Sequence, residues 1–243
     1  MMEEIIRSTA HREYSLPKVP WLVMQKWEKL LFLHWPLSTE KVKRHLPTDL
    51  ELDTYNGEAW MSMVAFKVND MRFRRIPLPP YFKSSLQLNV RTYVKRNGVR
   101  GVYFFQIDTN HLPTVIGARL ATLPYSYAKM SMVEKEGEVT FSSSRKEEES
   151  GWNIQYSVAE EKETLEKGSI SHWLLERYFL WTFTNGKLYA GAIHHKQWKV
   201  QDANVHIDNH SMSDFLDTNV VNKPAIVHYA DSKKTLIYPM KRV

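Results

Sequence analysis

The sequence contains no cysteine, which excludes disulfide bonds, thiolate catalysis and cysteine-ligated zinc and is compatible with a reducing cytoplasm. No apolar run approaches the roughly 18 residues of a membrane helix, and the N-terminal segment carries acidic residues without an apolar core of signal-peptide length. Motifs for phosphate-binding loops, serine nucleophile elbows and metalloprotease helices are also missing. We therefore expect a cytoplasmic protein that has no cofactor and no membrane partner.

The composition is that of a folded protein, with 43% hydrophobic, 12% aromatic and 25% charged residues in a chain of 243 residues. This length fits one or two domains. Since no repeat, low-complexity tract or linker interrupts the chain, we expect one domain over residues 1–243. The formal charge is +6, but basic and acidic residues are interspersed, so a solvated surface is favoured and no nucleic-acid partner is expected.

One predicted strand has a polar face opposite an apolar face. In QLNVRTYV the side chains alternate, so one face carries Gln87, Asn89, Arg91 and Tyr93. The segment KRNGVRG then supplies a turn, and GVYFFQID returns as a second strand rich in aromatic and β-branched residues. This stretch is predicted to form a hairpin that concentrates the polar chemistry of the chain.

Turn and capping signals complete an architecture rich in hairpins. Asn-Gly steps between strand-like segments predict hairpin turns at Asn56-Gly57, Asn97-Gly98 and Asn185-Gly186. Capping residues and prolines predict short helices over Ser38–Leu46, Pro113–Thr122 and Ser169–Leu180. The proline-rich segment RRIPLPPYFK and the PYSY segment are expected to be loops, and SRKEEESG is expected to end another hairpin.

The segments MQKWEKLLFLHWP, LNVRTYV, GVYFFQID, LPYSYAKM, LERYFLW and IHHKQW resemble a bacterial family of uncharacterised proteins, the YqjF-like family, in the acetoacetate decarboxylase-like superfamily. This resemblance covers most of the chain. More distantly, HLPTDLELDTYNGEAWMSMV, NGVRGVYFF and VIGARLATLPYSYAKM resemble blocks of acetoacetate decarboxylase in the same order, over about residues 42–130. The resemblance implies a mainly β (α+β) protein, an antiparallel β-barrel or cone with a few short helices.

The resemblance breaks at the residues that would carry the reaction. Acetoacetate decarboxylase uses a lysine pair after a Tyr-Pro step, and the matching positions here are Tyr125 and Ser126. Neither side chain can form an imine, because that step needs a primary amine. The decarboxylase also keeps a carboxylate at the position matching Gln87, whose amide cannot accept a proton. We therefore expect the fold without the Schiff-base reaction, and we expect the nearby Lys129 to be solvated.

Three histidines are further candidates for ligand-binding residues. The resemblance favours WEKLLFLHW as a strand, in which strict alternation puts His34 on one face and Trp27 with Leu31 on the other. His34 would then point into the barrel or be hydrogen-bonded within the core. His194 and His195 are adjacent, so on a strand they point to opposite faces, and only one of them is expected to face a cavity.

Together these polar residues predict a pocket for a small organic acid. Arginine binds a carboxylate through paired hydrogen bonds, while tyrosine and histidine donate to a carbonyl. The candidate ligand-binding residues are Gln87, Asn89, Arg91, Arg119, Tyr125, Tyr127, His34, His194 and His195. Two arginines and one tyrosine of this set, Arg91, Arg119 and Tyr125, are expected to converge on one cavity.

A structural alternative stays open, in which these arginines pair with Glu58, Asp108 or Glu176 and the tyrosines pack the barrel ends. No metal site is expected, because His206 and His210 have helical spacing without a helical pattern around them.

Two function classes also stay open: a binder of a small carboxylate-bearing ligand, and an enzyme of lyase or hydratase type that acts on a small oxo acid by acid-base chemistry. The sequence leaves open whether the chain forms a homo-oligomer.

Overall fold

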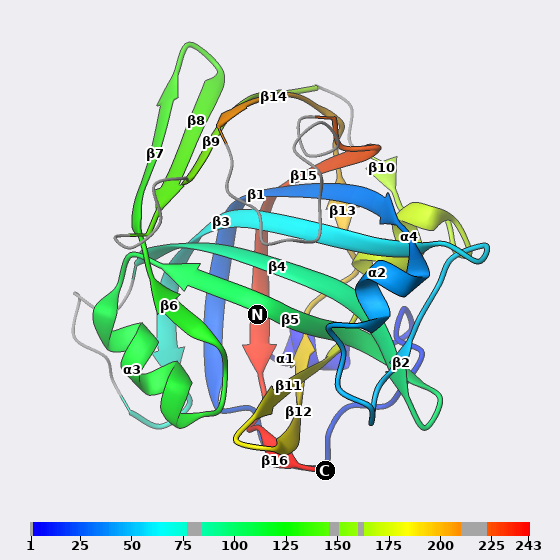
Figure 1. Cartoon of the computed structure of the whole chain (residues 1–243). Helices are drawn as coiled ribbons and strands as arrows, with labels where there is room; N and C mark the ends of the chain where they lie inside the picture. The colour runs from blue at the N-terminus through cyan, green and yellow to red at the C-terminus, as the bar shows by residue number, and fades with distance from the viewer. Residues whose placement is uncertain (1, 77–83, 146–150, 160–162, 210–222) are drawn as a thin grey trace.

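The computed structural model describes residues 2–76, 84–145, 151–159, 163–209 and 223–243. It is mostly β-strand with four short helices (Figure 1). The helices are α1 (Met2–Arg7), α2 (Thr39–Lys43), α3 (Leu112–Leu120) and α4 (Ile170–Leu175). Among the described residues, no helix is both long enough and apolar enough to cross a membrane.

A large mixed sheet forms the body of the protein. Its strands are paired in the order β2-β4-β3-β1-β15-β12-β11-β5-β6, β16 pairs with β12, and β4 also pairs with β5. The pairing of β4 with β5 turns this path back on itself, so the sheet curves around an interior as a cone. Their bounds are β1 (Val23–Leu37), β2 (Glu51–Leu52), β3 (Ala59–Phe73), β4 (Ser85–Arg96), β5 (Val99–Thr109), β6 (Tyr125–Tyr127), β11 (Phe179–Thr184), β12 (Lys187–His194), β15 (Ile226–Ile237) and β16 (Lys241–Arg242).

A second sheet covers part of the outside of the cone. It contains β7 (Lys129–Lys135), β8 (Glu138–Ser144), β9 (Gly151–Val158) and β14 (Ala203–Asn209), and its β7–β8 hairpin projects at the upper left of Figure 1. Leu88 and Val90 of β4 pack in one buried cluster with Phe141 and Ile154 of this sheet. A short pair, β10 (Glu163–Thr164) with β13 (Lys199–Val200), completes the fold.

The predicted polar face of β4 is confirmed as the inner face. Its apolar face packs outward against the second sheet, whereas Tyr93 belongs to a separate interior cluster with Phe32 and Trp173. Because successive side chains of a strand point to opposite faces, Arg91 is directed to the interior with Tyr93. The two packed clusters therefore determine which side of β4 faces the inside of the cone.

All three Asn-Gly turns are present, since each asparagine and each glycine has a positive φ, with values of 51° and 86° at Asn56 and Gly57. Type I′ hairpin turns require this conformation at both central residues. The turn at Asn56-Gly57 does not join a hairpin of paired strands, because β2 and β3 both pair with β4 and only the bridge Tyr55–Glu58 closes it. The strand over WEKLLFLHW is also confirmed as part of β1, but its strict alternation is wrong. The pairing of β1 with β3 shifts register between Glu28 and Leu31, and Lys29 has φ 53°. This bulge moves Trp27 to the interior cluster.

Two further predictions need correction. The helix predicted from Ser169 ends at Leu175, and Phe179–Thr184 forms β11, because its aromatic and β-branched residues pair with β12. Tyr125–Tyr127 is not a loop but the short strand β6, which pairs in parallel with β5. The helices predicted near residues 38–46 and 113–122 are present as α2 and α3. Most of RRIPLPPYFK, the end of the SRKEEESG hairpin and His210 lie outside the described residues.

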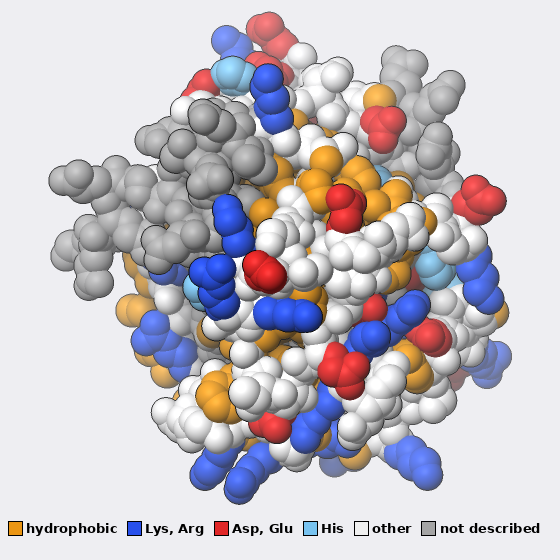
Figure 2. All heavy atoms as spheres, turned by 45° about the vertical axis from the view of Figure 1, so that its right-hand side comes forward, with side chains coloured by type: hydrophobic (Ala, Val, Ile, Leu, Met, Phe, Trp, Pro, Cys, Tyr) orange, Lys and Arg blue, Asp and Glu red, His pale blue; other side chains and the backbone are white. Residues whose placement is uncertain are grey.

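The surface carries charges of both signs. On the face seen in Figure 2, Lys and Arg side chains are spread among Asp and Glu side chains. Hydrophobic side chains are exposed between them in small areas. This distribution agrees with the interspersed charges of the sequence.

Candidate functional site

A cavity with a volume of about 100 Å³ lies inside the cone, and we refer to it as the inner cavity. Its walls come from strands that are far apart in the sequence, mainly β1, β3, β4, β5, β11 and β12, and most of its lining is apolar. The polar side chains in its walls belong to Gln25, Gln87, Asn89, Arg91, Tyr125, Arg177 and His195. Among its described lining residues there is no lysine, aspartate or glutamate.

Arg91 is the cation that β4 directs to the inner cavity. It is half-buried, and burial lowers the pKa of its guanidinium. Its Nε atom is buried without a hydrogen-bond partner, and its Cζ lies 6.0 Å from the centre of the Phe32 ring. Within the described chain no carboxylate forms an ion pair with Arg91. Its charge is therefore not compensated by any acid in the part of the chain that the structure describes.

A buried hydrogen-bond network starts at Arg91, and we call it the Arg91–Ser171 network. The Tyr93 hydroxyl, whose interaction with the Arg91 guanidinium raises the pKa of that cation, lies 2.5 Å from Ser62 Oγ. Ser62 Oγ lies 2.6 Å from His34 Nδ1. Ser62 and His34 are neighbours on paired strands, β3 and β1. The network thus anchors Arg91 through groups on three adjacent strands.

The network continues from His34 to α4. His34 Nε2 lies 3.2 Å from His228 Nδ1, and His228 Nε2 lies 2.9 Å from Ser171 Oγ. Burial, the largest cause, lowers the pKa of His34 well below its usual value and that of His228 to about 4. Both rings are therefore neutral at pH 7.

The proton positions in the network follow from its cationic end. The Arg91 cation interacts favourably with the lone pairs of the Tyr93 oxygen, so the phenol proton is directed to Ser62 instead. Ser62 then donates to His34 Nδ1, His34 donates through Nε2 to His228, and His228 donates through Nε2 to Ser171. This assignment gives every group in the network a partner and favours the Nε2–H tautomer of both histidines.

Tyr125 and Gln87 meet at another part of the inner cavity. Gln87 Nε2 donates to the Tyr125 hydroxyl over 2.6 Å, and burial raises the pKa of Tyr125 to about 12. The phenol therefore stays protonated at neutral pH. Its proton is available as a donor because the bond to Gln87 uses the oxygen as an acceptor.

The structure does not bring Arg119 or Tyr127 to the inner cavity. Arg119 is exposed on α3, and its Nε donates to the backbone oxygen of Tyr125 over 2.6 Å. Tyr127 is 51% exposed and does not line the inner cavity. Neither Arg91 nor Arg119 pairs with the acids of the structural alternative, since Asp108 pairs with Arg145 instead.

The adjacent histidines separate as the alternation of a strand requires. His195, directly after β12, lines the inner cavity, and its Nδ1 lies 2.8 Å from the Lys196 backbone oxygen. Burial lowers its pKa well below the usual value. His194 faces the other way, with Nε2 2.7 Å from the Ile5 backbone oxygen. The N-terminal segment therefore covers His194, and only His195 reaches the cavity.

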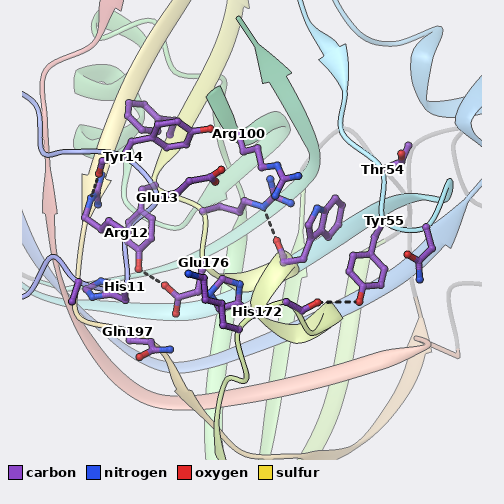
Figure 3. A pocket seen from close by; sticks show the side chains of 18 residues that line it. His11, Arg12, Glu13, Tyr14, Thr54, Tyr55, Arg100, His172, Glu176 and Gln197 are labelled. Atoms are coloured by element: carbon purple, nitrogen blue, oxygen red, sulfur yellow. Dashed lines mark hydrogen bonds between the residues drawn. The ribbon is translucent and has the colours of Figure 1, made fainter. Parts of the chain in front are cut away.

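A larger hollow, with a volume of about 830 Å³, adjoins the inner cavity, and we refer to it as the outer cleft (Figure 3). It is lined by residues 10–14, 54–56, 167–168, 172–173 and 176–179 together with Arg100 and Gln197. Arg177 and Phe179 line both spaces. They form the wall that separates the outer cleft from the inner cavity.

Arg177 is held in this wall by several contacts. Its side chain is 3% exposed, and its Nη1 donates to Asp53 Oδ2 over 2.7 Å. Its Nε donates to the Trp173 backbone oxygen over 2.6 Å, and its Cζ lies 4.3 Å from the Trp173 ring centre and 5.1 Å from that of Tyr93. Arg91 and Arg177 therefore flank the same tyrosine.

Sequence reasoning missed Arg177, Ser62, Tyr93 and His228 as site residues. Tyr93 was placed on the polar face of β4, which was a usable signal. The others contact the site through tertiary packing, and no local pattern around them marks them. Among the described residues, no group of three histidine, aspartate or glutamate side chains is arranged to hold a metal ion.

Known proteins resemble this chain along most of its length. A model of the DUF2071 family, described as an uncharacterized conserved protein, matches residues 24–234. The chain is 36% identical over 233 residues to the uncharacterized protein YqjF of Bacillus subtilis (strain 168), a match that covers 95% of this chain and 96% of that protein.

Two solved structures resemble it in three dimensions. The acetoacetate decarboxylase of Legionella pneumophila matches with a TM-score of 0.65 and 14% identity, over 98% of this chain and 94% of that one. The enduracididine biosynthesis enzyme MppR complexed with pyruvate matches with a TM-score of 0.65 and 10% identity, over 95% of this chain and 93% of that one. At these identities the similarity establishes a shared fold.

Proposed function

The chain belongs to the DUF2071 family and has the fold of acetoacetate decarboxylase-like proteins, and from its site we propose that it binds a small carboxylate-bearing molecule in the inner cavity. The observation that carries this proposal is Arg91. It lines a cavity whose described walls carry no acidic side chain, and its Nε has no hydrogen-bond partner among the described residues.

A carboxylate is proposed as the ligand group because it would compensate the positive charge of Arg91. A buried cation without a counter-ion is costly, and the cost falls when an anion pairs with it. The Arg91–Ser171 network supplies neutral hydrogen-bonding groups but no negative charge. A bound carboxylate would supply that charge and a partner for Nε, and arginine presents its donors in a fork that suits a carboxylate.

Other wall residues support a ligand that carries one more polar group. Asn89 Oδ1 is buried without a hydrogen-bond partner and belongs to the same cavity wall as Arg91. The Asn89 side chain can donate a hydrogen bond to a ligand carbonyl through its nitrogen or accept one from a ligand hydroxyl through its oxygen. The volume of about 100 Å³ corresponds to roughly three water molecules of liquid, which restricts the ligand to a small acid. Pyruvate in the structurally similar MppR complex is a molecule of this kind.

The absence of lysine from the described cavity walls supports the further proposal that no Schiff base forms here. A second candidate function is acid-base catalysis on a small oxo acid. It is supported by His195 and Tyr125, which line the cavity as a neutral histidine and a protonated phenol. The first can accept a proton and the second can donate one. Product formation from oxo acids, followed by NMR, separates this enzyme from a binding protein.

Calorimetry with short acids tests the proposed function. The probes are pyruvate, acetoacetate and propionate, with propionamide as the uncharged control. We expect carboxylates to bind the wild type and to lose affinity by at least about tenfold in Arg91→Gln, since a hydrogen bond to a charged group is worth roughly 1.5–3 kcal/mol. Arg119→Gln is the matched control, because this arginine is exposed outside the cavity. Equal binding by wild type and Arg91→Gln would exclude the proposed site.

We also propose that the chain forms one domain over residues 1–243, that it is located in the cytoplasm and that it has no nucleic-acid partner. Limited proteolysis, cell fractionation and a filter-binding assay test these points in turn. Size-exclusion chromatography determines whether the chain forms a homo-oligomer.

A further inference from the structure

We propose that the outer cleft is a second binding site, for an aromatic molecule that carries an anionic group. This inference goes beyond the proposed function, because it concerns different walls and a larger ligand. A volume of about 830 Å³ lies within the range of roughly 300–1,000 Å³ that is usual for small-molecule sites. The inner cavity is far too small for such a ligand.

The anionic group is expected at Arg177 and Arg100. Both guanidinium groups approach the same oxygen, Asp53 Oδ2, at 2.7 Å from Arg177 Nη1 and 3.7 Å from Arg100 Nε. Two cations thus share one carboxylate, which leaves one positive charge uncompensated. Arg177 Nη2 is buried without a hydrogen-bond partner, whereas the Arg100 side chain is 46% exposed. Both residues line the outer cleft, so an anion there can bind the exposed Arg100 guanidinium and lies next to the buried charge of Arg177.

The acids of the outer cleft do not neutralise this charge. Glu176 accepts a hydrogen bond from the Tyr178 hydroxyl (Figure 3) and another from the Trp198 backbone nitrogen. It keeps its negative charge, but the lining carries four cations, Arg12, Arg100, Lys167 and Arg177, against two carboxylates, Glu13 and Glu176, with Asp53 beside Arg177 as a third. Glu13 is exposed and forms no ion pair with Arg100 within the described chain. The cleft keeps an excess of positive charge, which favours an anionic ligand.

Aromatic side chains form the walls next to this charge. Tyr55 and Trp173 lie with ring centres 5.7 Å apart, and the Tyr55 hydroxyl donates to the Gly168 backbone oxygen over 3.2 Å (Figure 3). On another wall Tyr14 packs edge-on against Phe179 at 5.7 Å, with its hydroxyl bonded to a backbone oxygen. These bonds fix the rings, so they offer preformed surfaces for a flat ligand.

Binding experiments with the full chain test the second site. The probes are indole-3-acetate as an aromatic carboxylate, adenosine monophosphate as an aromatic phosphate, neutral indole and inorganic phosphate. We expect at least one of the two aromatic anions to bind the wild type, and the better of them shows which anionic group the site takes. Arg100→Gln is expected to weaken that binding by roughly tenfold, through loss of a charge-assisted hydrogen bond.

Control variants separate this site from the inner cavity. Arg119→Gln and Arg91→Gln are expected to bind the aromatic anion as the wild type does, while Arg91→Gln alone loses short carboxylates. The inference is overturned if neither aromatic anion binds, if Arg100→Gln binds it with unchanged affinity, or if indole or inorganic phosphate alone binds as tightly. Failure of the proposed function would instead appear as unchanged binding of short acids in Arg91→Gln.

Discussion

His34 Nε2 lies 3.2 Å from His228 Nδ1, so two histidines that are 194 positions apart form the central link of the Arg91–Ser171 network. Both rings are buried, with 0% and 4% exposure. The link needs one N–H and one bare nitrogen, and a protonated histidine has only donors. Protonation of His228 would place two donors against each other beside the Arg91 cation. Burial, the largest cause, and this link therefore keep both rings neutral.

This link predicts that acid destabilises the protein before its carboxylates titrate. The pKa of His228 is about 4 in the folded protein and about 6.5 in an unfolded chain. Between these values the unfolded chain binds more protons, so the free energy of unfolding falls as the pH decreases. The contribution of His228 is complete above pH 6.5, and its loss amounts to roughly 3 kcal/mol by pH 4. His34 acts in the same direction.

Urea unfolding at pH 7.5, 6.0 and 5.0 measures this effect. His228→Gln removes the titrating group and should flatten the decline between pH 6.5 and 5, whatever its effect at pH 7.5. His206→Gln is the control for the loss of a histidine, because its side chain is exposed on β14 outside the network. Equal slopes for the wild type and His228→Gln would show that the network does not hold His228 neutral.

Asp53→Asn is predicted to be strongly destabilising. The carboxylate and Arg177 are both buried, with side-chain exposures of 3% each. Removing the negative charge leaves the Arg177 guanidinium buried without its counter-ion, and such a change typically costs about 3–5 kcal/mol. Urea unfolding at pH 7.5 measures the loss.

Asp208→Asn is the matched control for this prediction. Its carboxylate is 40% exposed and pairs with an exposed histidine, His206, so the expected change is within about 0.5 kcal/mol. A loss below about 1 kcal/mol in Asp53→Asn would mean that the Arg177 charge is compensated by other groups or by water.

The polar face of β4 could be predicted because the period of a strand determines which side chains share a face once the strand is recognised. The Asn-Gly turns could be predicted because these residues adopt positive φ readily. The bulge in β1 could not be predicted from the sequence. Lys29 has φ 53°, and lysine is not a residue type that signals such a conformation. The shift of Trp27 to the interior followed from that single residue.

Tertiary contacts limited the prediction of the site. Arg177 and Asp53 are 124 positions apart, and no local pattern marks their pairing. The helical pattern after Ser169 also appeared to continue beyond Leu175, although strand pairing with β12 overrides it. Arg119 was expected to converge on the cavity with Arg91 and Tyr125, whereas it is exposed on α3. Residues from one strand were therefore located more reliably than residues that meet through packing.

Treatment with acetoacetate and borohydride is predicted to leave this protein unmodified. A trapped imine needs a lysine in the cavity, but no lysine lies among the described lining residues of the inner cavity. Tyr125 stands where the resemblance to acetoacetate decarboxylase implies an amine, and Lys129 is exposed. Mass spectrometry of the reduced protein measures the adduct, with an acetoacetate decarboxylase treated in parallel as the positive control.

Lys233 is the lysine whose amine could most easily contradict this prediction. Burial lowers the pKa of its amine to about 8, so at pH 8 about half of it is unprotonated and chemically able to attack a ketone. Its Nζ, however, donates to the Gln197 backbone oxygen over 2.8 Å and lies 4.8 Å from the Trp198 ring centre, and it does not line the inner cavity. A stoichiometric adduct that disappears in Lys233→Arg would show that the amine chemistry of this fold has moved to β15. An adduct on Lys129 would place it on β7 instead, and either result would contradict a cavity without Schiff-base chemistry.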